Sequence, residues 1–148
     1  DWSSDVCSSD LDLGKFLGFW AGQSLKKSHF FQEVDCVIPI PLHAKRLRER
    51  TYNQAECIGN GLASGLQIPI LPLGLQKSLQ SHSLIGQDRS HRFELLKDSF
   101  EVLADVRGKH ILIVDDTLTT GATLLAAAEK IKAAGAKEVS FFTLAALK

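Results

Sequence analysis

The chain has 148 residues, of which 45% are hydrophobic and 23% charged, and its 17 basic residues balance 17 acidic ones. This length suits one domain with a sizeable core, and the zero net charge excludes a whole-chain attraction to nucleic acid or to an anionic membrane. Three cysteines without C-x-x-C spacing (Cys7, Cys36 and Cys57) argue against a zinc ribbon and a disulfide framework. No apolar run reaches membrane-spanning length. We therefore expect a cytoplasmic protein with no membrane partner and no metal ligated by the chain itself.

The first eleven residues, DWSSDVCSSDL, are polar and show no clean helical or strand period, and the chain contains no methionine. Two interpretations stay open. Residues 1–11 are either a non-native scar joined to a truncated natural chain, or a disordered native tail. In both cases the domain is expected to comprise residues 12–148.

The first half of the chain is predicted to contain a helix, a strand and a second helix. The first helix carries one apolar stripe at helical spacing, formed by Leu13, Phe16, Leu17, Trp20 and Ala21. Residues 36–41, CVIPIP, form a short buried strand that prolines close. Residues 53–66 return to helical spacing, with Ala55, Ile58, Leu62 and Leu66 on one face.

A long polar region then separates this half from the next strands. Residues 68–73 are an apolar run bounded by turn residues. Residues 76–98 are polar and weakly periodic, which indicates a long loop or a loop with a short helix. Such loops in compact domains often act as lids. Residues 99–103, SFEVL, alternate as a strand does.

The last third of the chain gives the clearest pattern. Residues 110–116, HILIVDD, are a continuous apolar run with acidic residues at its end, typical of a central parallel strand covered on both faces. Residues 121–135 form a helix that stops at Gly135 and turns Leu124, Leu125, Ala128 and Ile131 inward. Residues 138–147 form a closing strand. Strands alternating with helices predict an α/β fold with an open, mostly parallel sheet flanked by helices.

Asp115 and Asp116 stand where an open α/β sheet binds its ligands, at the carboxyl end of a strand. The following loop offers backbone N–H groups, the hydroxyls of threonines and the positive end of a helix dipole, which together suit an anion. Gly121 allows the backbone to approach that anion. The pattern is neither a Walker loop nor a dinucleotide fingerprint. The carboxylates suit the vicinal hydroxyls of a sugar, with Mg²⁺ bound through waters; alternatively, they cap the next helix.

The string ILIVDDTLTTGAT resembles the phosphoribosyl-pyrophosphate signature of type I phosphoribosyltransferases. The resemblance implies that family's fold, with Asp115 and Asp116 on the ribose hydroxyls, the loop on the 5-phosphate, and Mg²⁺ bound through the substrate pyrophosphate. The loop residues implied in substrate binding are Thr117, Leu118, Thr119, Thr120, Gly121, Ala122 and Thr123. Thr117 departs from the family, which usually has an apolar residue there.

A second stretch, IPIPLHAKRLRERTYNQAE at residues 38–56, resembles the competence protein F family, a branch of that superfamily linked to DNA uptake. The matching positions are Pro39, Pro41, Leu42, His43, Arg46, Arg50, Asn53 and Gln54. Thr51 replaces the usual glycine. The resemblance implies that Arg46, with Lys45 and Arg50, serves the pyrophosphate, since guanidinium forks bind phosphate in a bidentate manner. A solvated basic helix face is the alternative, and for His43 a capping or packing role stays open beside a ligand contact.

Residues 82–100 resemble the flexible loop of the same family, with Arg89, Arg92 and Phe100 in place and Leu95 in the position of the usual asparagine. The family's N-terminal cysteine-rich zinc module is missing from this sequence.

These resemblances imply a phosphoribosyltransferase, a glycosyltransferase, that binds phosphoribosyl pyrophosphate or a ribose 5-phosphate nucleotide and is linked to competence. Asp115, Asp116 and Arg46 would be its catalytic residues. The alternative is a non-catalytic module that senses a nucleotide or docks onto a DNA-uptake helicase. Binding of single-stranded DNA by residues 45–50 is a third class, which the single nearby aromatic residue, Tyr52, supports weakly. The sequence does not indicate the acceptor base.

Overall fold

The computed structural model describes residues 2–78 and 88–148, and for residues 2–11 and Ala44 the backbone alone. The elements in chain order are α1 (Trp2–Leu25), the 3-10 helix η1 (His29–Glu33), β1 (Cys36–Pro39), α2 (Ala44–Arg50), α3 (Gln54–Leu66), β2 (Leu75–Lys77), α4 (Arg89–Asp98), β3 (Phe100–Val102), β4 (His110–Leu118), α5 (Ala122–Ala133) and β5 (Glu138–Ala146). The backbone of residues 2–11, for which the sequence shows no period, belongs to α1.

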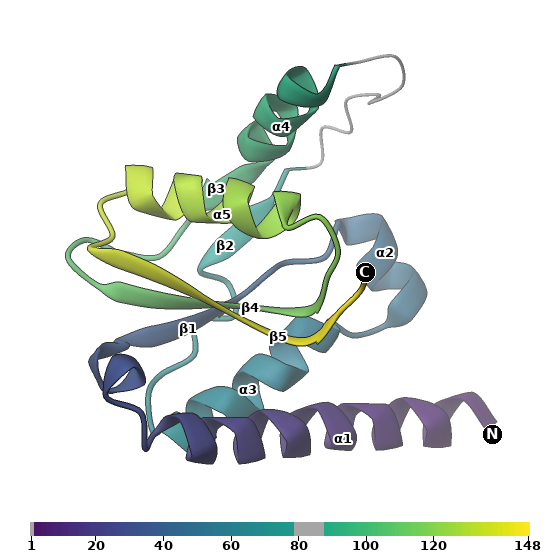
Figure 1. Cartoon of the computed structure of the whole chain (residues 1–148). Helices are drawn as coiled ribbons and strands as arrows, with labels where there is room; N and C mark the ends of the chain where they lie inside the picture. The colour runs from purple at the N-terminus through teal and green to yellow at the C-terminus, as the bar shows by residue number, and fades with distance from the viewer. Residues whose placement is uncertain (1, 79–87) are drawn as a thin grey trace.

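The main sheet is parallel and has the strand order β1-β4-β5, so the predicted central strand is confirmed. Helix α5 covers one face of this sheet, and α3 with α1 beneath it covers the other (Figure 1). Side chains of β4 alternate between the two faces. Ile111 and Ile113 belong to the core on the α5 side, and Leu112 and Val114 to the core on the α3 side. Burial on both faces explains why β4 reads as one continuous apolar run.

A second, two-stranded sheet pairs β2 with β3 in an antiparallel manner. The strand predicted at residues 99–103 is therefore confirmed as β3, but it lies outside the main sheet. Its partner β2, only three residues long, was not predicted. Helix α4 is the short helix allowed for in residues 76–98, and residues 79–87 of that segment lie outside the described part. The run at residues 68–73 forms a single parallel bridge, from Ile70 to Val37 of β1.

Helix α3 confirms its predicted face, since its four apolar positions are buried. Helix α1 confirms its predicted stripe only in part: Leu17 and Ala21 are half-buried, but three other positions are largely exposed, namely Leu13 at 55%, Phe16 at 64% and Trp20 at 66%. The helix instead turns a glycine face toward α3. A Cβ on Gly18 would lie 2.2 Å from the carbonyl oxygen of Ile58, and one on Gly61 would lie 2.0 Å from that of Lys15. The prediction was wrong at these three positions because backbone contact, rather than apolar side chains, selects the packed face.

Helix α5 buries Leu124 and Ile131 as predicted, together with Ala126 and Ala127, against the main sheet. Leu125 was expected to point inward but is 53% exposed. The predicted stop is confirmed, because Gly135 follows the helix with a φ of +104°. In the described part of the chain, no helix combines the length and the apolar character needed to cross a membrane.

Candidate functional site

The carboxyl end of β4 changes from buried to half-buried at Asp115. The strand does not end at Asp116, as the sequence had indicated, but continues to Leu118 because β5 pairs with it that far. Thr117 lies opposite Ala145, and Leu118 lies opposite Ala146. Two of the expected loop residues, Thr117 and Leu118, are therefore strand residues.

The turn from β4 into α5 is short and is centred on Gly121, whose φ is +78°. Gly121, rather than an aspartate, is the residue at the N-terminal cap of α5, and it has no side chain that could cap the helix. The alternative that an aspartate caps α5 is therefore wrong. The turn is held by the Thr120 hydroxyl, which accepts a hydrogen bond of 3.3 Å from the Ala122 N–H. A left-handed glycine at the start of a helix leaves neighbouring N–H groups directed outward, as an anion requires.

The end of β1 forms the opposite wall of the site. The Ile40 N–H donates to the Val114 carbonyl, which holds the two strand ends together. Asn53 caps α3 through its Oδ1 and donates from Nδ2 to the Ile40 carbonyl at 3.0 Å. His43 caps α2, because its Nδ1 accepts from the Lys45 N–H at 3.3 Å. The capping role that the sequence allowed for His43 is confirmed.

Helix α2 carries the basic residues and ends at Arg50, and the next residue, Thr51, caps it in the left-handed conformation with a φ of +64°. This is the position where the family pattern has glycine, and the conformation accounts for that preference. At the other end of the turn, the Arg50 guanidinium donates to the Gln54 Oε1 at 3.0 Å. This hydrogen bond holds the Arg50 side chain against the start of α3.

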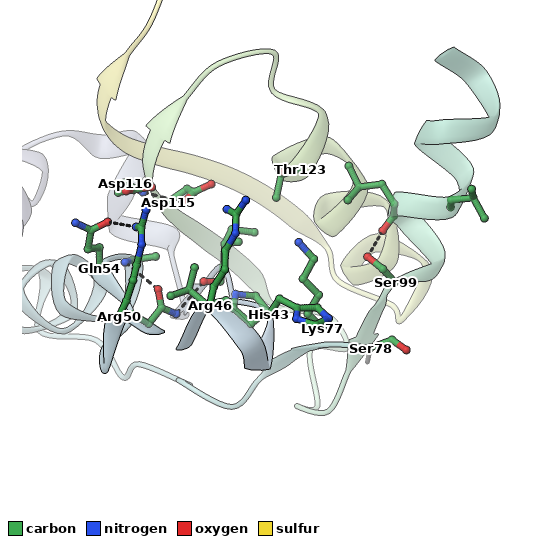
Figure 2. A pocket seen from close by; sticks show the side chains of 17 residues that line it. His43, Arg46, Arg50, Gln54, Lys77, Ser78, Ser99, Asp115, Asp116 and Thr123 are labelled. Carbon is green, nitrogen blue, oxygen red and sulfur yellow. Dashed lines mark hydrogen bonds between the residues drawn. The ribbon is translucent and has the colours of Figure 1, made fainter. Parts of the chain in front are cut away.

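A cavity of about 620 Å³ lies between these elements. It is bounded by the ends of β1 and β4, by α2, the start of α3, the end of β2, and by α4. Its charged lining residues are Asp115, Asp116, Arg46, Arg50 and Lys77, and its other lining residues are Ile40, Pro41, Leu42, His43, Asn53, Gln54, Ala55, Ser78, Leu95, Leu96, Ser99 and Thr123. Figure 2 shows Arg46, Arg50 and Lys77 extending into the cavity toward the side that holds the two aspartates and Thr123.

The structure thus brings together five of the residues predicted to be catalytic or substrate-binding: Asp115, Asp116, Arg46, Arg50 and Thr123. Thr120 and Ala122 line a neighbouring groove together with the first half of α4. Lys45, Thr117, Leu118, Thr119 and Gly121 are not among the residues that line either hollow.

Lys77 is a cavity residue that the sequence reasoning missed. It ends β2, and its ammonium group lies 5.6 Å from the centre of the Phe100 ring. Burial lowers the pKa of Lys77, and the nearby charge of Arg46 lowers it further. An anion that entered the cavity would oppose both effects. No signal in the sequence distinguishes this lysine, because the strand that places it is too short to show a period.

The pKa of Asp115 is raised, whereas that of Lys77 is lowered. Burial, and next a hydrogen bond with the Asp116 side chain, raise the pKa of Asp115 to about 6. Its Oδ1 also accepts from the Asp116 N–H at 2.9 Å, which counteracts the rise. Two adjacent half-buried carboxylates therefore lie side by side, and hydrogen-bond donors or a cation would stabilise their charged forms.

Among the described residues, no group of three or more His, Cys, Asp or Glu side chains could hold a metal ion. The two aspartates alone fit Mg²⁺ only in the manner typical of this ion, which keeps most of its waters and binds through one or two carboxylates plus substrate phosphates. The two carboxylates are therefore compatible with a metal ion that binds together with an anionic substrate.

Comparison with known proteins gives the family. The model of the phosphoribosyl transferase domain family matches residues 53–147. Competence protein F of Haemophilus influenzae is 27% identical over 139 residues, which cover 92% of this chain and 60% of that protein. An adenine phosphoribosyltransferase of Helicobacter pylori is 34% identical over 129 residues, which cover 84% of this chain and 64% of that protein. The chain therefore spans 60% and 64% of the lengths of these two relatives.

Among solved structures, the glutamine phosphoribosylpyrophosphate amidotransferase of B. subtilis aligns with a TM-score of 0.59 at 24% identity, covering 93% of this chain and 26% of that one. At this identity the likeness shows the fold alone. The fold expected from the signature string is thus confirmed, and so is the resemblance to competence protein F. The chain belongs to the phosphoribosyl transferase domain family.

Proposed function

We propose that the cavity binds phosphoribosyl pyrophosphate, or a ribose 5-phosphate nucleotide, together with Mg²⁺. The observation that carries this proposal is the charge arrangement in one cavity of substrate size. Two adjacent carboxylates at the end of β4 stand opposite the cations Arg46, Arg50 and Lys77. A ligand that has both vicinal hydroxyls and phosphate groups matches both halves, whereas an anion without hydroxyls would be repelled by the aspartates.

The aspartates would bind the ribose. Carboxylates accept hydrogen bonds in pairs, and the two hydroxyls of a ribose donate them in pairs. The raised pKa of Asp115 supports this assignment, because burial removes water from the carboxylate and ligand hydroxyls would donate hydrogen bonds in its place. Mg²⁺, when bound, would supply positive charge between these carboxylates and the pyrophosphate.

The cations would bind the pyrophosphate. Arg46 and Arg50 offer forks that match phosphate oxygens, and Lys77 adds a point charge near Arg46. In a transfer reaction, the bond from the ribose anomeric carbon to the pyrophosphate oxygen breaks as a bond to the acceptor nitrogen forms. These three residues then stabilise the negative charge that builds on the leaving pyrophosphate. Lys45 is exposed and would contribute only a longer-range attraction.

The 5-phosphate would bind at the turn between β4 and α5. The left-handed Gly121 presents backbone to the ligand side, and the N–H groups at the start of α5 are the donors. Thr123 lines the cavity on the first turn of this helix and would add a hydroxyl. Thr119 and Thr120 are exposed on this turn, and their hydroxyls would donate to the phosphate, that of Thr120 while it accepts from the Ala122 N–H.

The names of the relatives extend the proposal. One relative is named competence protein F, and from this we take a link to competence. A second is named adenine phosphoribosyltransferase, which makes adenine the first acceptor to test. The alternative is a module that binds the same ligand without turnover, for nucleotide sensing or for docking onto a DNA-uptake helicase. Single-stranded DNA binding has less support, because α2 presents charges without aromatic residues for stacking.

Calorimetric titration tests the binding proposal. Phosphoribosyl pyrophosphate with Mg²⁺ should bind more tightly than either ribose 5-phosphate or pyrophosphate alone, because only the whole ligand engages both halves of the cavity. Equal affinity for pyrophosphate and for phosphoribosyl pyrophosphate would refute the ribose half. Release of pyrophosphate in the presence of adenine and other bases then separates an enzyme from a binding module. Oligonucleotide titration at two salt concentrations tests the DNA class.

A further inference from the structure

The outer edge of β5 is the feature of the molecule that the proposed function does not use. The strand is nine residues long and pairs with β4 along one edge. On the other side of the main sheet, β1 is covered, since Pro69 and Leu71 exchange backbone hydrogen bonds with Val37. No strand of the described residues pairs with the second edge of β5, which lies open in the front of Figure 1.

This edge lacks the features that usually prevent strand association. Between Glu138 and Lys148 the sequence is VSFFTLAAL, with neither a charge nor a proline. Proteins normally interrupt a long edge strand with one of these, or cover it. Three large apolar residues near the edge are also unusually exposed: Phe141 is 41% exposed, Leu144 is 39% exposed and Leu147 is 63% exposed. An open nine-residue edge with this composition is expected to have a partner.

We propose that β5 pairs with β5 of a second copy of this chain, antiparallel, about a two-fold axis at Thr143. The charges of the strand select this register. Glu138 and Lys148 are the only charged residues from position 138 to the last residue, and centring the pair on Thr143 places each opposite the other in the partner. Centring the pair on Phe142 instead would leave Glu138 opposite Ala146.

The same register matches side chains by size. Phe141 falls opposite Ala145 and Leu147 falls opposite Val139, so these two exposed large residues each meet a smaller one, while Leu144 falls opposite Phe142. Thr143 falls opposite itself, as a β-branched residue that suits cross-strand contact. The interface is self-complementary, as a two-fold dimer requires.

The dimer has a defined architecture. The two three-stranded sheets join into one six-stranded sheet of order β1-β4-β5-β5-β4-β1. Because the central pair is antiparallel, the carboxyl ends of the two β4 strands point in opposite directions. The two candidate sites therefore lie at opposite ends of the joined sheet, and each remains complete within its own chain.

A cross-linking experiment on the unaltered chain tests the register directly. Glu138 and Lys148 are ten residues apart on one extended segment, about 33 Å, so a zero-length carbodiimide link between them cannot form within one chain. In the dimer each lies opposite the other residue of the partner. Mass spectrometry should find the Glu138–Lys148 link in the dimer band. A chain that stays monomeric at high micromolar concentration in sedimentation velocity, or a dimer without this link, would overturn the proposal.

Charge variants at the axis give a second test that also reports specificity. Thr143→Lys and Thr143→Glu each place like charges opposite one another and should weaken the dimer by about fivefold or more. An equimolar mixture of the two variants should form the mixed dimer and recover the association. Gln76→Lys and Gln76→Glu, on an exposed position of β2, are the matched controls and should leave association unchanged. Equal association of the Thr143 variants and the unaltered chain, or a mixture no stronger than its components, would contradict the interface.

Discussion

Replacement of Gly18 by alanine is the most informative test of the fold around the site. Helix α3 carries the Asn53 cap that holds the site wall, and α1 packs against it by backbone contact. A Cβ on Gly18 would lie 2.2 Å from the Ile58 carbonyl oxygen and 3.0 Å from the Leu62 nitrogen, both backbone atoms. Ordinary contact begins at 3.4 Å, so α1 would have to move outward by more than 1 Å.

The magnitude follows from two opposing effects. Overpacking of a well-packed contact costs about 1–3 kcal/mol, and here the upper part of the range applies because backbone cannot rotate away as a side chain can. Alanine gains about 1 kcal/mol over glycine in a helix interior. We therefore expect Gly18→Ala to lower the free energy of unfolding by about 1–2 kcal/mol, which lowers Tm by about 2–8 °C for a chain of this size.

Gly14, one helical turn earlier, is the matched control. A Cβ there would meet the Cys57 and Ile58 side chains at 3.5 Å and 3.7 Å, which is ordinary contact. Gly14→Ala should therefore gain the helix propensity without the clash and raise the free energy of unfolding by about 1 kcal/mol. Urea unfolding followed by circular dichroism measures both variants. If Gly18→Ala proves as stable as Gly14→Ala, the close packing of α1 on α3 is wrong.

Three further predictions concern the site and its supports. Thr51→Gly should raise the free energy of unfolding by about 1 kcal/mol, because the left-handed backbone at Thr51 strains a β-branched residue; an unchanged urea midpoint would count against this. The folded chain holds the Asp115 proton more tightly than the unfolded chain, with a pKa of about 6 against 3.8, so stability should fall as pH rises from 4 to 7. Asp115→Asn should remove this fall, so its free energy of unfolding relative to that of the unaltered chain should be higher at pH 7.5 than at pH 4.5. The same relative value at both pH values would contradict the prediction. Arg46→Lys should weaken pyrophosphate binding by about tenfold because it loses the bidentate fork, whereas Arg48→Lys, outside the cavity lining, should bind normally; calorimetry that finds the two variants alike would leave α2 as a charged surface.

The parts of the fold that sequence could predict are those where side-chain burial repeats with a period. Strand β4 is buried on both faces and so reads as an uninterrupted apolar run, and α3 buries one apolar face. The packed face of helix α1 could not be predicted in this way, because it is made of glycines while Leu13, Phe16 and Trp20 face outward. Period alone cannot reveal that two backbones will touch.

The candidate site also contains residues that the sequence could predict and residues that it could not. Asp115, Asp116 and Arg46 could be predicted because they stand in long strings with a chemical reason for each residue type. Lys77 could not, since its place depends on a three-residue strand and on tertiary contact with Phe100. The conformation of Thr51 likewise shows only in the structure, where a residue other than glycine occupies the left-handed position that ends α2.

The affinity of phosphoribosyl pyrophosphate for the chain that carries Asp115→Asn and Asp116→Asn together tests the central claim most directly. Both residues line the cavity at the half-buried end of β4, so their neutral amides should leave the fold intact, as circular dichroism would verify. In the presence of Mg²⁺, calorimetry should detect binding to the unaltered chain and none to the double variant, because the ribose hydroxyls and the metal lose both carboxylates. Equal affinity of the two proteins would show that the ligand, if it binds, does not use the end of β4.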